Sequence, residues 1–184
     1  MDLAKLINST KYEHSRKVSL ISGLMAEKAG YSQSEVQIIS QAALYHDIGK
    51  SGIPKIILNK TSVLTPEEFD IVKTHTVIGC NQITHAIQVL TAAAIVAQQH
   101  HEHVNSDAGY HRLSGDAIHP YAKLVAVADV YDALRARRSY KEPWDAARIA
   151  EYFAAQSGKQ FDRDMVNLLF RVLGDVQALY SEKH

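Results

Sequence analysis

Apolar residues recur along this chain with the spacing of helices almost throughout. Between residues 11 and 29, Val18, Ile21 and Met25 follow one another at intervals of three or four, which gives one face of a helix an apolar surface. No stretch of useful length alternates between apolar and polar residues, as a half-buried strand would. The pattern therefore predicts an all-α fold.

Capping residues and glycines place the helix boundaries. Gly30 is a stop signal for the first helix, and Ser32 and Thr65 each begin a capping-box pattern with Glu three residues later. Gly49 is expected to let the chain leave the second helix, and Gly79 to permit close approach of another backbone. Later helices are expected over residues 89–101, 121–136, 144–156 and 162–173, with loops over residues 51–63 and 102–119.

Composition limits the class of protein. The 184 residues are 46% hydrophobic and contain no Pro/Gly/Ser-rich linker, so one domain over residues 1–184 is expected, with residues 1–10 as a lead-in segment. The 20 basic and 20 acidic residues balance, which argues against a partner such as duplex nucleic acid or an anionic membrane. The longest apolar run, residues 91–97, is too short to span a bilayer. A single cysteine, Cys80, and the lack of a secretion signal predict a cytoplasmic protein.

Ten histidines are the outlier in this composition. His14 and His75 fall on the apolar faces of their helices, and His46 follows the apolar face of the second helix. A single inward histidine is more often a core residue than a metal ligand. The pair His100 and His101 at a helix end is, by itself, more often stabilised by the helix dipole. Only their combination points to a shared site.

Carboxylates accompany these histidines. Asp47 follows His46 directly, and Asp129 and Asp132 share a helix face with Val125. Two carboxylates on an apolar face are costly to bury unless they meet cations or hydrogen-bond donors. Imidazole nitrogens and carboxylate oxygens together are the donor set of hydrolytic metal sites.

The candidate ligands number more than one metal ion requires. They are five imidazoles and two carboxylates, from His14, His46, Asp47, His75, His100, His101 and Asp129. One metal takes three or four protein ligands, so seven predict two divalent cations, with Asp47 able to bridge them. Such a pair suits in-line attack of water on phosphorus, and Lys50, one turn after Asp47, is placed to hold a phosphate.

Short segments accompany these residues in a fixed order. They are Glu13-His14-Ser15-Arg16-Lys17-Val18, Ala43-Leu44-Tyr45-His46-Asp47-Ile48-Gly49-Lys50, Gly52-Ile53-Pro54, Leu64-Thr65-Pro66-Glu67-Glu68, His75 with Gly79, His100-His101-Glu102, Gly109-Tyr110, Ala128-Asp129-Val130-Tyr131-Asp132-Ala133-Leu134, Arg138-Ser139-Tyr140-Lys141 and Phe161-Asp162. This set resembles the HD-GYP domain, a branch of the HD phosphohydrolase superfamily associated with hydrolysis of cyclic di-GMP. The match covers almost the whole chain. It implies an HD-domain helical bundle of about seven to nine helices.

The resemblance also implies roles for particular residues. One metal would be held by His14, His46, Asp47 and Asp129, and the other by Asp47, His75, His100 and His101. Asp47 and Lys50 are the implied catalytic residues, with Lys50 at a phosphate-contacting position. Arg138 and Lys141 fall where members of the family hold phosphates or guanines, and Asp132 matches an aspartate that orients neighbouring groups. Iron or manganese is the metal associated with the family, and the ligand set also admits zinc or nickel.

The chain departs from the family pattern at three places. The Gly-Tyr-Pro motif reads Gly109-Tyr110-His111, and the usual Trp-Asp-Gly before it reads Val104-Asn105-Ser106-Asp107. The rigid turn of proline is lost, so the loop is expected to be mobile until Tyr110 contacts a ligand by stacking or through its hydroxyl. Thr10 stands where members with a third metal carry Glu, which favours two metals. The histidines that match no ligand position, interpreted as surface or loop residues, are His85, His103, His111 and His119.

The sequence thus predicts a dinuclear phosphodiesterase that converts cyclic di-GMP to linear pGpG or GMP. One alternative is an HD phosphohydrolase acting on another nucleotide, which the altered loop favours. A second alternative is a domain that keeps its metals for stability and binds cyclic di-GMP, or a signalling partner such as a diguanylate cyclase domain, without turnover.

Overall fold

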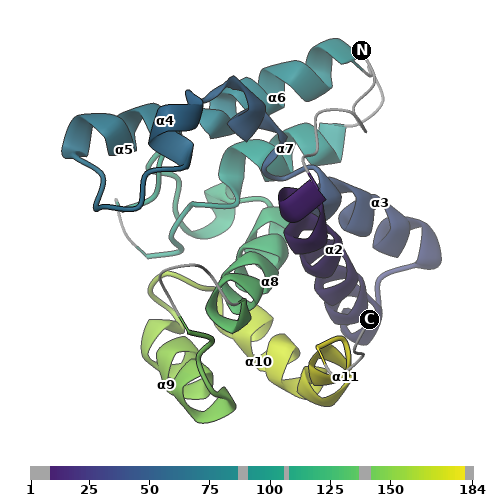
Figure 1. The fold of residues 1–184 in the computed structure, drawn as a ribbon. Coiled ribbons are helices and arrows are strands. Elements are labelled where there is room, and N and C mark those ends of the chain that lie inside the picture. The colour runs from purple at the N-terminus through teal and green to yellow at the C-terminus, as the bar shows by residue number, and fades with distance from the viewer. Residues whose placement is uncertain (1–8, 87–90, 106–107, 137–141, 181–184) are drawn as a thin grey trace.

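The chain folds into a bundle of helices (Figure 1). The computed structural model describes residues 9–86, 91–105, 108–136 and 142–180. The helices are α2 (Ser9–Ala29), α3 (Gln33–Leu44), η1 (Ile48–Gly52), α4 (Lys55–Leu58), α5 (Pro66–Lys73), α6 (His75–Ala86), α7 (Thr91–Gln99), η2 (Gly115–Ala117), α8 (Pro120–Arg135), α9 (Ala146–Gln156), α10 (Arg163–Arg171) and α11 (Leu173–Ala178). Within these ranges the only β-type pairing is an isolated bridge between Ser157 and Phe161, so the predicted all-α fold is confirmed.

The helices begin and end where local chemistry satisfies their free backbone groups. Ser32 accepts a hydrogen bond from the N–H of Glu35, and Thr65 accepts one from the N–H of Glu68, so both predicted capping boxes are present. Gly30 follows α2 with a φ of 85°, the left-handed conformation that glycine adopts without strain.

Two segments differ from the prediction. Residues 51–63 are not simply a loop, because α4 and the end of η1 lie within them. The helix predicted over residues 162–173 ends at Arg171, and a separate helix, α11, begins at Leu173, with Val172 capping both. In addition, α3 ends at Leu44, so His46 lies on the turn that follows the helix. Single turns of helix contain too few residues for hydrophobic periodicity to reveal them.

Two glycines bring η1 against α6. The prediction that Gly49 serves to end a helix is wrong, because this residue is buried within η1. A Cβ at Gly49 would lie 1.9 Å from the carbonyl oxygen of His75 and 2.4 Å from the nitrogen of Gly79. Gly79 permits this close backbone approach, as predicted, since its own Cβ would lie 3.2 Å from the nitrogen of Gly49. The contact sets Asp47, two residues before Gly49, beside His75.

The small-residue helix α7 lies deep in the bundle, where it contacts α3, α6 and α8 (Figure 1). Its buried residues Ala93, Ala94, Val96 and Ala97 let these helices pack closely around it. The surrounding helices contribute large buried side chains such as Ile39, each worth about 1.5–3 kcal/mol when removed from water. The end of α7, where the two adjacent histidines follow, is thereby fixed in the centre of the molecule.

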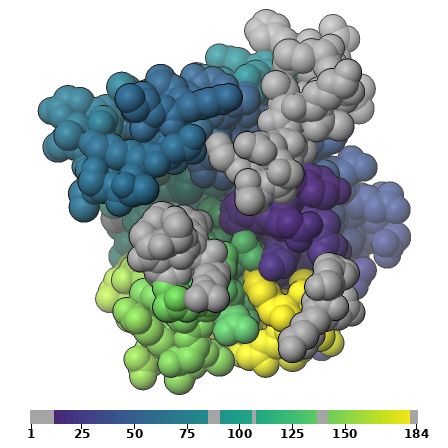
Figure 2. Space-filling model, in the orientation of Figure 1, coloured from purple at the N-terminus to yellow at the C-terminus, as the bar shows by residue number. Residues whose placement is uncertain are grey.

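The segment from α4 to α5 forms one corner of the face shown in Figure 2, coloured blue. Its surface includes exposed apolar side chains, among them Ile56 and Val63, which are 84% and 92% exposed. Among the described residues, no helix combines the length and the apolar character needed to cross a membrane.

Candidate metal centre

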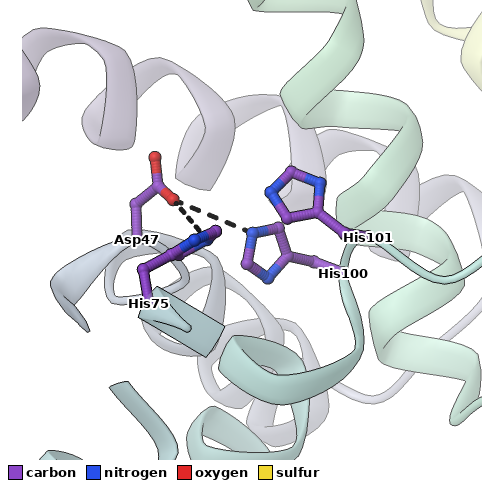
Figure 3. Close-up of side chains that lie close together, drawn as sticks. All are labelled: Asp47, His75, His100 and His101. Carbon is purple, nitrogen blue, oxygen red and sulfur yellow. Dashed lines mark ion pairs between the residues drawn. The ribbon is translucent and has the colours of Figure 1, made fainter. Parts of the chain in front are cut away.

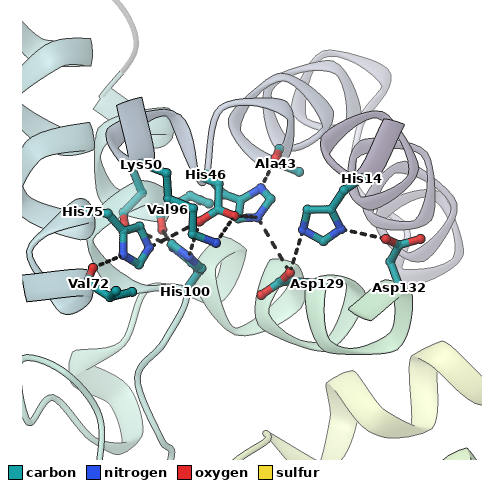
Figure 4. A network of polar contacts seen from close by, with 12 residues as sticks. His14, Ala43, His46, Lys50, Val72, His75, Val96, His100, Asp129 and Asp132 are labelled. Atoms are coloured by element: carbon teal, nitrogen blue, oxygen red, sulfur yellow. Dashed lines mark hydrogen bonds and ion pairs between the residues drawn. The ribbon is translucent and has the colours of Figure 1, made fainter. Parts of the chain in front are cut away.

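All seven predicted ligands converge on one region of the bundle, as Figures 3 and 4 together show. They form two groups, within each of which the potential ligand atoms lie within 4.8 Å of one another. The groups consist of Asp47, His75, His100 and His101, and of His14, His46 and Asp129. The contributing elements are α2, the turn after α3, α6, the end of α7, and α8. Residues far apart in the sequence thus supply a mixed nitrogen and oxygen donor set.

The backbone orients three of the imidazoles in the same way. The Nδ1 atom of His46 lies 2.7 Å from the carbonyl oxygen of Ala43, three residues earlier, and His75 makes the same 2.7 Å contact with Val72. The Nδ1 atom of His100 lies 3.0 Å from the carbonyl oxygen of Val96. A carbonyl oxygen can only accept, so Nδ1 must carry the proton in each ring. The Nε2 atom is then left with a free lone pair, the form that binds a metal.

These free lone pairs point at one another in a buried space. The Nε2 atoms of His46, His75 and His100 and the Oδ1 atom of Asp47 are buried without a hydrogen-bond partner. An unsatisfied buried polar group costs about 1–3 kcal/mol, and native proteins contain few of them. Four such acceptors in one place are satisfied together by cations, so these residues fit a metal centre.

Asp47 lies between the two groups. Its Oδ1 atom is 3.3 Å from Nε2 of His75 and 3.8 Å from Nε2 of His100 (Figure 3). Its Oδ2 atom is 3.5 Å from Nε2 of His46. With Nδ1 protonated, each of these Nε2 atoms is an acceptor that faces an acceptor oxygen of Asp47. Two acceptors cannot form a hydrogen bond with each other, so these distances fit ligands placed around a common cation better than ion pairs. One carboxylate oxygen faces each group, as a bridging ligand requires.

Burial and neighbouring charges keep His100, His101 and Asp47 in the protonation states that bind cations. Burial lowers the pKa of His101 to about 4, and burial together with the neighbouring His101 holds the pKa of His100 well below its ordinary value. Burial opposes the ionisation of Asp47, but the charge of the neighbouring Lys50 outweighs it and holds the pKa of Asp47 well below its usual range. Neutral imidazoles beside an ionised carboxylate are the forms that coordinate metal.

His14 is positioned by two carboxylates on α8. Its Nε2 atom lies 3.1 Å from Asp129, and its Nδ1 atom lies 2.6 Å from Asp132 (Figure 4). Burial disfavours the charged imidazole, but the hydrogen bonds to Asp129 and Asp132 outweigh it and raise the pKa of His14 to about 10. A cation at this position would replace the proton on Nε2, while Asp132 would still hold Nδ1. This is the orienting contact expected of Asp132.

The hydrogen bonds around Asp132 include a residue that no sequence pattern selects. Tyr180, after the end of α11, donates a hydrogen bond of 2.6 Å to the Oδ1 atom of Asp132. Burial raises the pKa of the Tyr180 hydroxyl strongly, so it remains a donor. A lone tyrosine near the end of the sequence carries no spacing signal, and only the packing of α11 against α2 reveals it.

The predicted substrate residues are only partly described. The amine of Lys50 contacts Oδ2 of Asp47, and Lys50 also lines a pocket of about 400 Å³ with Lys60, Leu64 and Val72. Tyr110 lies with its ring centroid 4.6 Å from that of His101. The remaining predicted positions lie outside the described residues or have side chains that do; these are Arg138, Lys141, Thr10 and His85.

Among the described side chains, the histidines without a predicted ligand role, His103, His111 and His119, do not join the two groups. His119 caps α8 and accepts a hydrogen bond from the N–H of Tyr121. His111 lies 3.0 Å from the hydroxyl of Thr76 and is partly buried. Glu102, which the sequence motif contains without a predicted role, is only 3% exposed, and its contacts prove important for the loop around Tyr110.

The fold and the two groups of ligands define an HD-domain architecture, and comparison with known families agrees. The HD domain family matches residues 1–165, and the chain belongs to this family. The resemblance that the ordered motifs indicate is thereby confirmed.

The chain is also similar to individual proteins whose names state an activity. The chain is 39% identical to the cyclic di-GMP phosphodiesterase response regulator RpfG of Xanthomonas campestris, over 90% of this chain and 44% of the relative. It is 36% identical to the 3'3'-cGAMP-specific phosphodiesterase 2 of Vibrio cholerae, over 85% of this chain and 30% of the relative. The chain thus spans less than half the length of these two proteins. The HD domain of the phosphodiesterase PgpH of L. monocytogenes has the same fold, with a TM-score of 0.71 at 22% identity over 100% of this chain and 99% of that one.

Proposed function

We propose that this domain is a metal-dependent phosphodiesterase that hydrolyses cyclic di-GMP to pGpG or GMP. The observation that carries the proposal is the convergence of buried, unsatisfied acceptor atoms from His46, His75, His100 and Asp47. The names of its relatives, a cyclic di-GMP phosphodiesterase and a cGAMP-specific phosphodiesterase, support the same reaction class.

The proposed cofactor is a pair of divalent cations, iron or manganese. His14, His46, Asp47 and Asp129 would hold one ion, and Asp47, His75, His100 and His101 the other. When bound, such a pair polarises a phosphoryl group and activates water for in-line attack. The proposal agrees with the two ligand groups and with the two oxygens of Asp47, one facing each group.

The residues of the chain would position and neutralise the substrate. Lys50, beside Asp47 and at the edge of the pocket, would hold a phosphate oxygen of the scissile bond. Lys60 lines the same pocket, where its amine is paired with the carboxylate of Glu68. Tyr110 would contact the substrate beside His101. Arg138 and Lys141 are proposed to contact phosphates or guanines, as the family resemblance implies.

A second substrate is favoured by a specific observation. A relative named as specific for 3'3'-cGAMP is nearly as similar to this chain as one named for cyclic di-GMP. Both molecules are cyclic dinucleotides with two phosphodiester bonds, so the metal centre suits either. Discrimination between them would fall to side chains that contact the bases. A signalling partner such as a diguanylate cyclase domain stays a prediction.

The test is turnover by protein loaded with manganese or with iron under anaerobic conditions. Cyclic di-GMP and 3'3'-cGAMP are offered separately, and linear dinucleotide and mononucleotide products are separated by chromatography. We expect metal-dependent cleavage that EDTA abolishes. Binding of cyclic di-GMP without any cleavage, in protein shown to contain both ions, would favour the non-catalytic alternative. If the protein neither binds nor cleaves either dinucleotide, the proposed substrate class is excluded.

A further inference from the structure

The backbone of the loop that carries Tyr110 is hydrogen-bonded to a buried carboxylate. Glu102 is 3% exposed, and its Oε1 atom accepts a hydrogen bond of 2.8 Å from the backbone N–H of His111. Its Oε2 atom accepts a second one of 2.8 Å from the backbone N–H of Leu113. Both oxygens of a buried carboxylate are therefore occupied by one short stretch of loop, which ties that stretch to the residue following His101.

A second contact, made by an imidazole, joins the same loop to α6. The Nε2 atom of His111 lies 3.0 Å from the hydroxyl oxygen of Thr76, which is fully buried on α6. The single hydrogen of this hydroxyl is directed to the carbonyl oxygen of Lys73, 2.9 Å away. The hydroxyl oxygen is then an acceptor, so His111 donates through Nε2–H. This bond links the loop to the residue next to His75.

The backbone of the loop is shaped to make these contacts. A Cβ at Gly109 would lie 2.4 Å from Oε2 of Glu102, so the chain can approach the carboxylate here only without a side chain. Arg112 adopts a φ of 59°, in the left-handed region that residues other than glycine rarely occupy. This bend lies between the two N–H groups that donate to Glu102, and it lets both reach one carboxylate.

Tyr110 stands next to His111, one of the points of attachment. Its ring centroid lies 4.6 Å from that of His101, 6.1 Å from that of Phe69 and 6.2 Å from that of His75. Burial raises the pKa of its hydroxyl to about 12, so the side chain remains a neutral phenol. The ring is thus held against two of the candidate metal ligands in the protein without substrate.

We propose that three residues, Glu102, His111 and Thr76, form a latch. The hydrogen bonds of this latch position Tyr110 beside the metal centre. In this chain a hydrogen-bonding histidine takes over the role of the proline in the Gly-Tyr-Pro pattern. On this proposal the loop is restrained without the proline, whereas the sequence predicts a mobile loop. Proline at position 111 would remove both the N–H that Glu102 accepts and the imidazole that reaches Thr76. The catalytic consequence rests on the proposed function, but the latch itself does not.

The experiment measures backbone hydrogen exchange in the metal-free protein, followed by kinetics of the metal-loaded protein. The variants are Thr76→Val, which removes the acceptor of His111 at nearly constant volume, and His111→Pro, which removes both contacts of that residue. The matched control is Thr84→Val on the same helix, where the hydroxyl bonds only the carbonyl oxygen of Cys80 at 2.8 Å. Both Thr→Val changes remove a hydroxyl-to-carbonyl bond, but only one touches the latch.

We expect exchange at the N–H of Leu113 to be about tenfold faster in Thr76→Val and His111→Pro than in the wild type. The Thr84→Val control should exchange like the wild type. In the kinetics, KM for cyclic di-GMP should rise in both latch variants, while kcat/KM for bis(p-nitrophenyl) phosphate, which has no bases to position, should hardly change. A purely structural defect would lower both activities together.

The latch would be overturned if the N–H of Leu113 exchanged at the wild-type rate in both latch variants. It would also be overturned if Thr84→Val accelerated this exchange as much as the latch variants do. Slower exchange in His111→Pro would show that proline restrains this loop better than the hydrogen bonds do. If the wild type cleaves neither phosphodiester, the proposed function fails, and the exchange data still decide whether the latch exists.

Discussion

At the residue scale, the candidate metal centre depends on which nitrogen of each imidazole is already occupied. His46, His75 and His100 each give Nδ1 to a backbone carbonyl, and His14 gives Nδ1 to Asp132. All four therefore present Nε2 to the cluster. The helical periodicity could predict that these side chains point inward. It could not predict the tautomer, because that depends on which oxygen meets Nδ1: a carbonyl of the preceding turn for three of these histidines, and Asp132 on another helix for His14.

The bridging position of Asp47 gives the first prediction. Asp47→Asn should lose at least one of two bound ions and essentially all hydrolysis, because a neutral amide cannot bridge two cations or balance their mutual repulsion. Elemental analysis of manganese-loaded protein and turnover of cyclic di-GMP measure this. The control is Asp116→Asn, an exposed carboxylate on η2, which should change neither. Retention of both ions with near-native turnover in Asp47→Asn would remove the bridging role.

Tyr180 gives the second prediction at this scale. Removing its hydroxyl in Tyr180→Phe leaves a buried oxygen of Asp132 without its donor, which should cost about 1–2 kcal/mol of the free energy of unfolding. The affinity for metal should also fall, because Asp132 orients His14. Urea denaturation and a metal titration report the two effects. Tyr152→Phe is the matched control, since its hydroxyl donates to the neutral Gln160, and it should leave metal affinity unchanged. Equal metal affinity in the wild type and Tyr180→Phe would show that Tyr180 serves stability alone.

At the element scale, the sequence predicted the helices whose ends carry their own chemical signals. The capping boxes at Ser32 and Thr65 are local, so they appear in the sequence as they do in the structure. The short helix η1 has no such signal, since its position is determined by the contact of Gly49 with α6. Tertiary contacts of this kind decide the conformation of short segments and cannot be read from their composition.

The contact between η1 and α6 can be tested directly. Gly49→Ala would place a methyl group 1.9 Å from the carbonyl oxygen of His75, a backbone atom that no side-chain rotation can move. We expect a loss of about 2–4 kcal/mol in the free energy of unfolding, with weaker metal binding as His75 shifts. Gly174→Ala on α11 is the control, because no described atom outside the neighbouring backbone of α11 lies within 4 Å of its added methyl group. It should be neutral or stabilising by about 0.5–1 kcal/mol. Similar stability in both variants would argue against tight packing at Gly49.

At the scale of the whole molecule, the metal centre exists because segments far apart in the chain meet. The sequence supplied the seven candidate ligands, since each lies in a recognisable motif. It could not supply the pairs Thr76 with His111 and Asp132 with Tyr180, which are 35 and 48 residues apart. Such partners have no common spacing, and each residue alone has an ordinary explanation. The three-dimensional arrangement is needed to connect them.

The contact between α2 and α8 predicts how the stability of the metal-free protein varies with pH. Burial opposes the charge on His14, but Asp129 and Asp132 raise its pKa to about 10, above the ordinary value of 6.5. A raised histidine pKa stabilises the fold fully below pH 6.5, and this contribution is lost as the pH rises toward 10. The wild type in EDTA should therefore lose thermal stability between pH 7 and pH 9.5, relative to a His14→Gln variant, in which nothing titrates at this position.

The comparison with His14→Gln isolates this contact above pH 7, because ionisable side chains that do not contact His14 titrate alike in both proteins, and carboxylates, the groups that it contacts, ordinarily titrate at much lower pH. Below pH 6.5 the lowered pKa of His101 acts in the opposite direction, so the measurement is made only above pH 7. Thermal unfolding followed by circular dichroism at half-unit steps of pH gives the difference in Tm between the two proteins. That difference should shrink as the pH rises. A constant difference from pH 7 to pH 9.5 would mean that His14 is neutral in the folded protein, and that its contacts with Asp129 and Asp132 do not hold a charge.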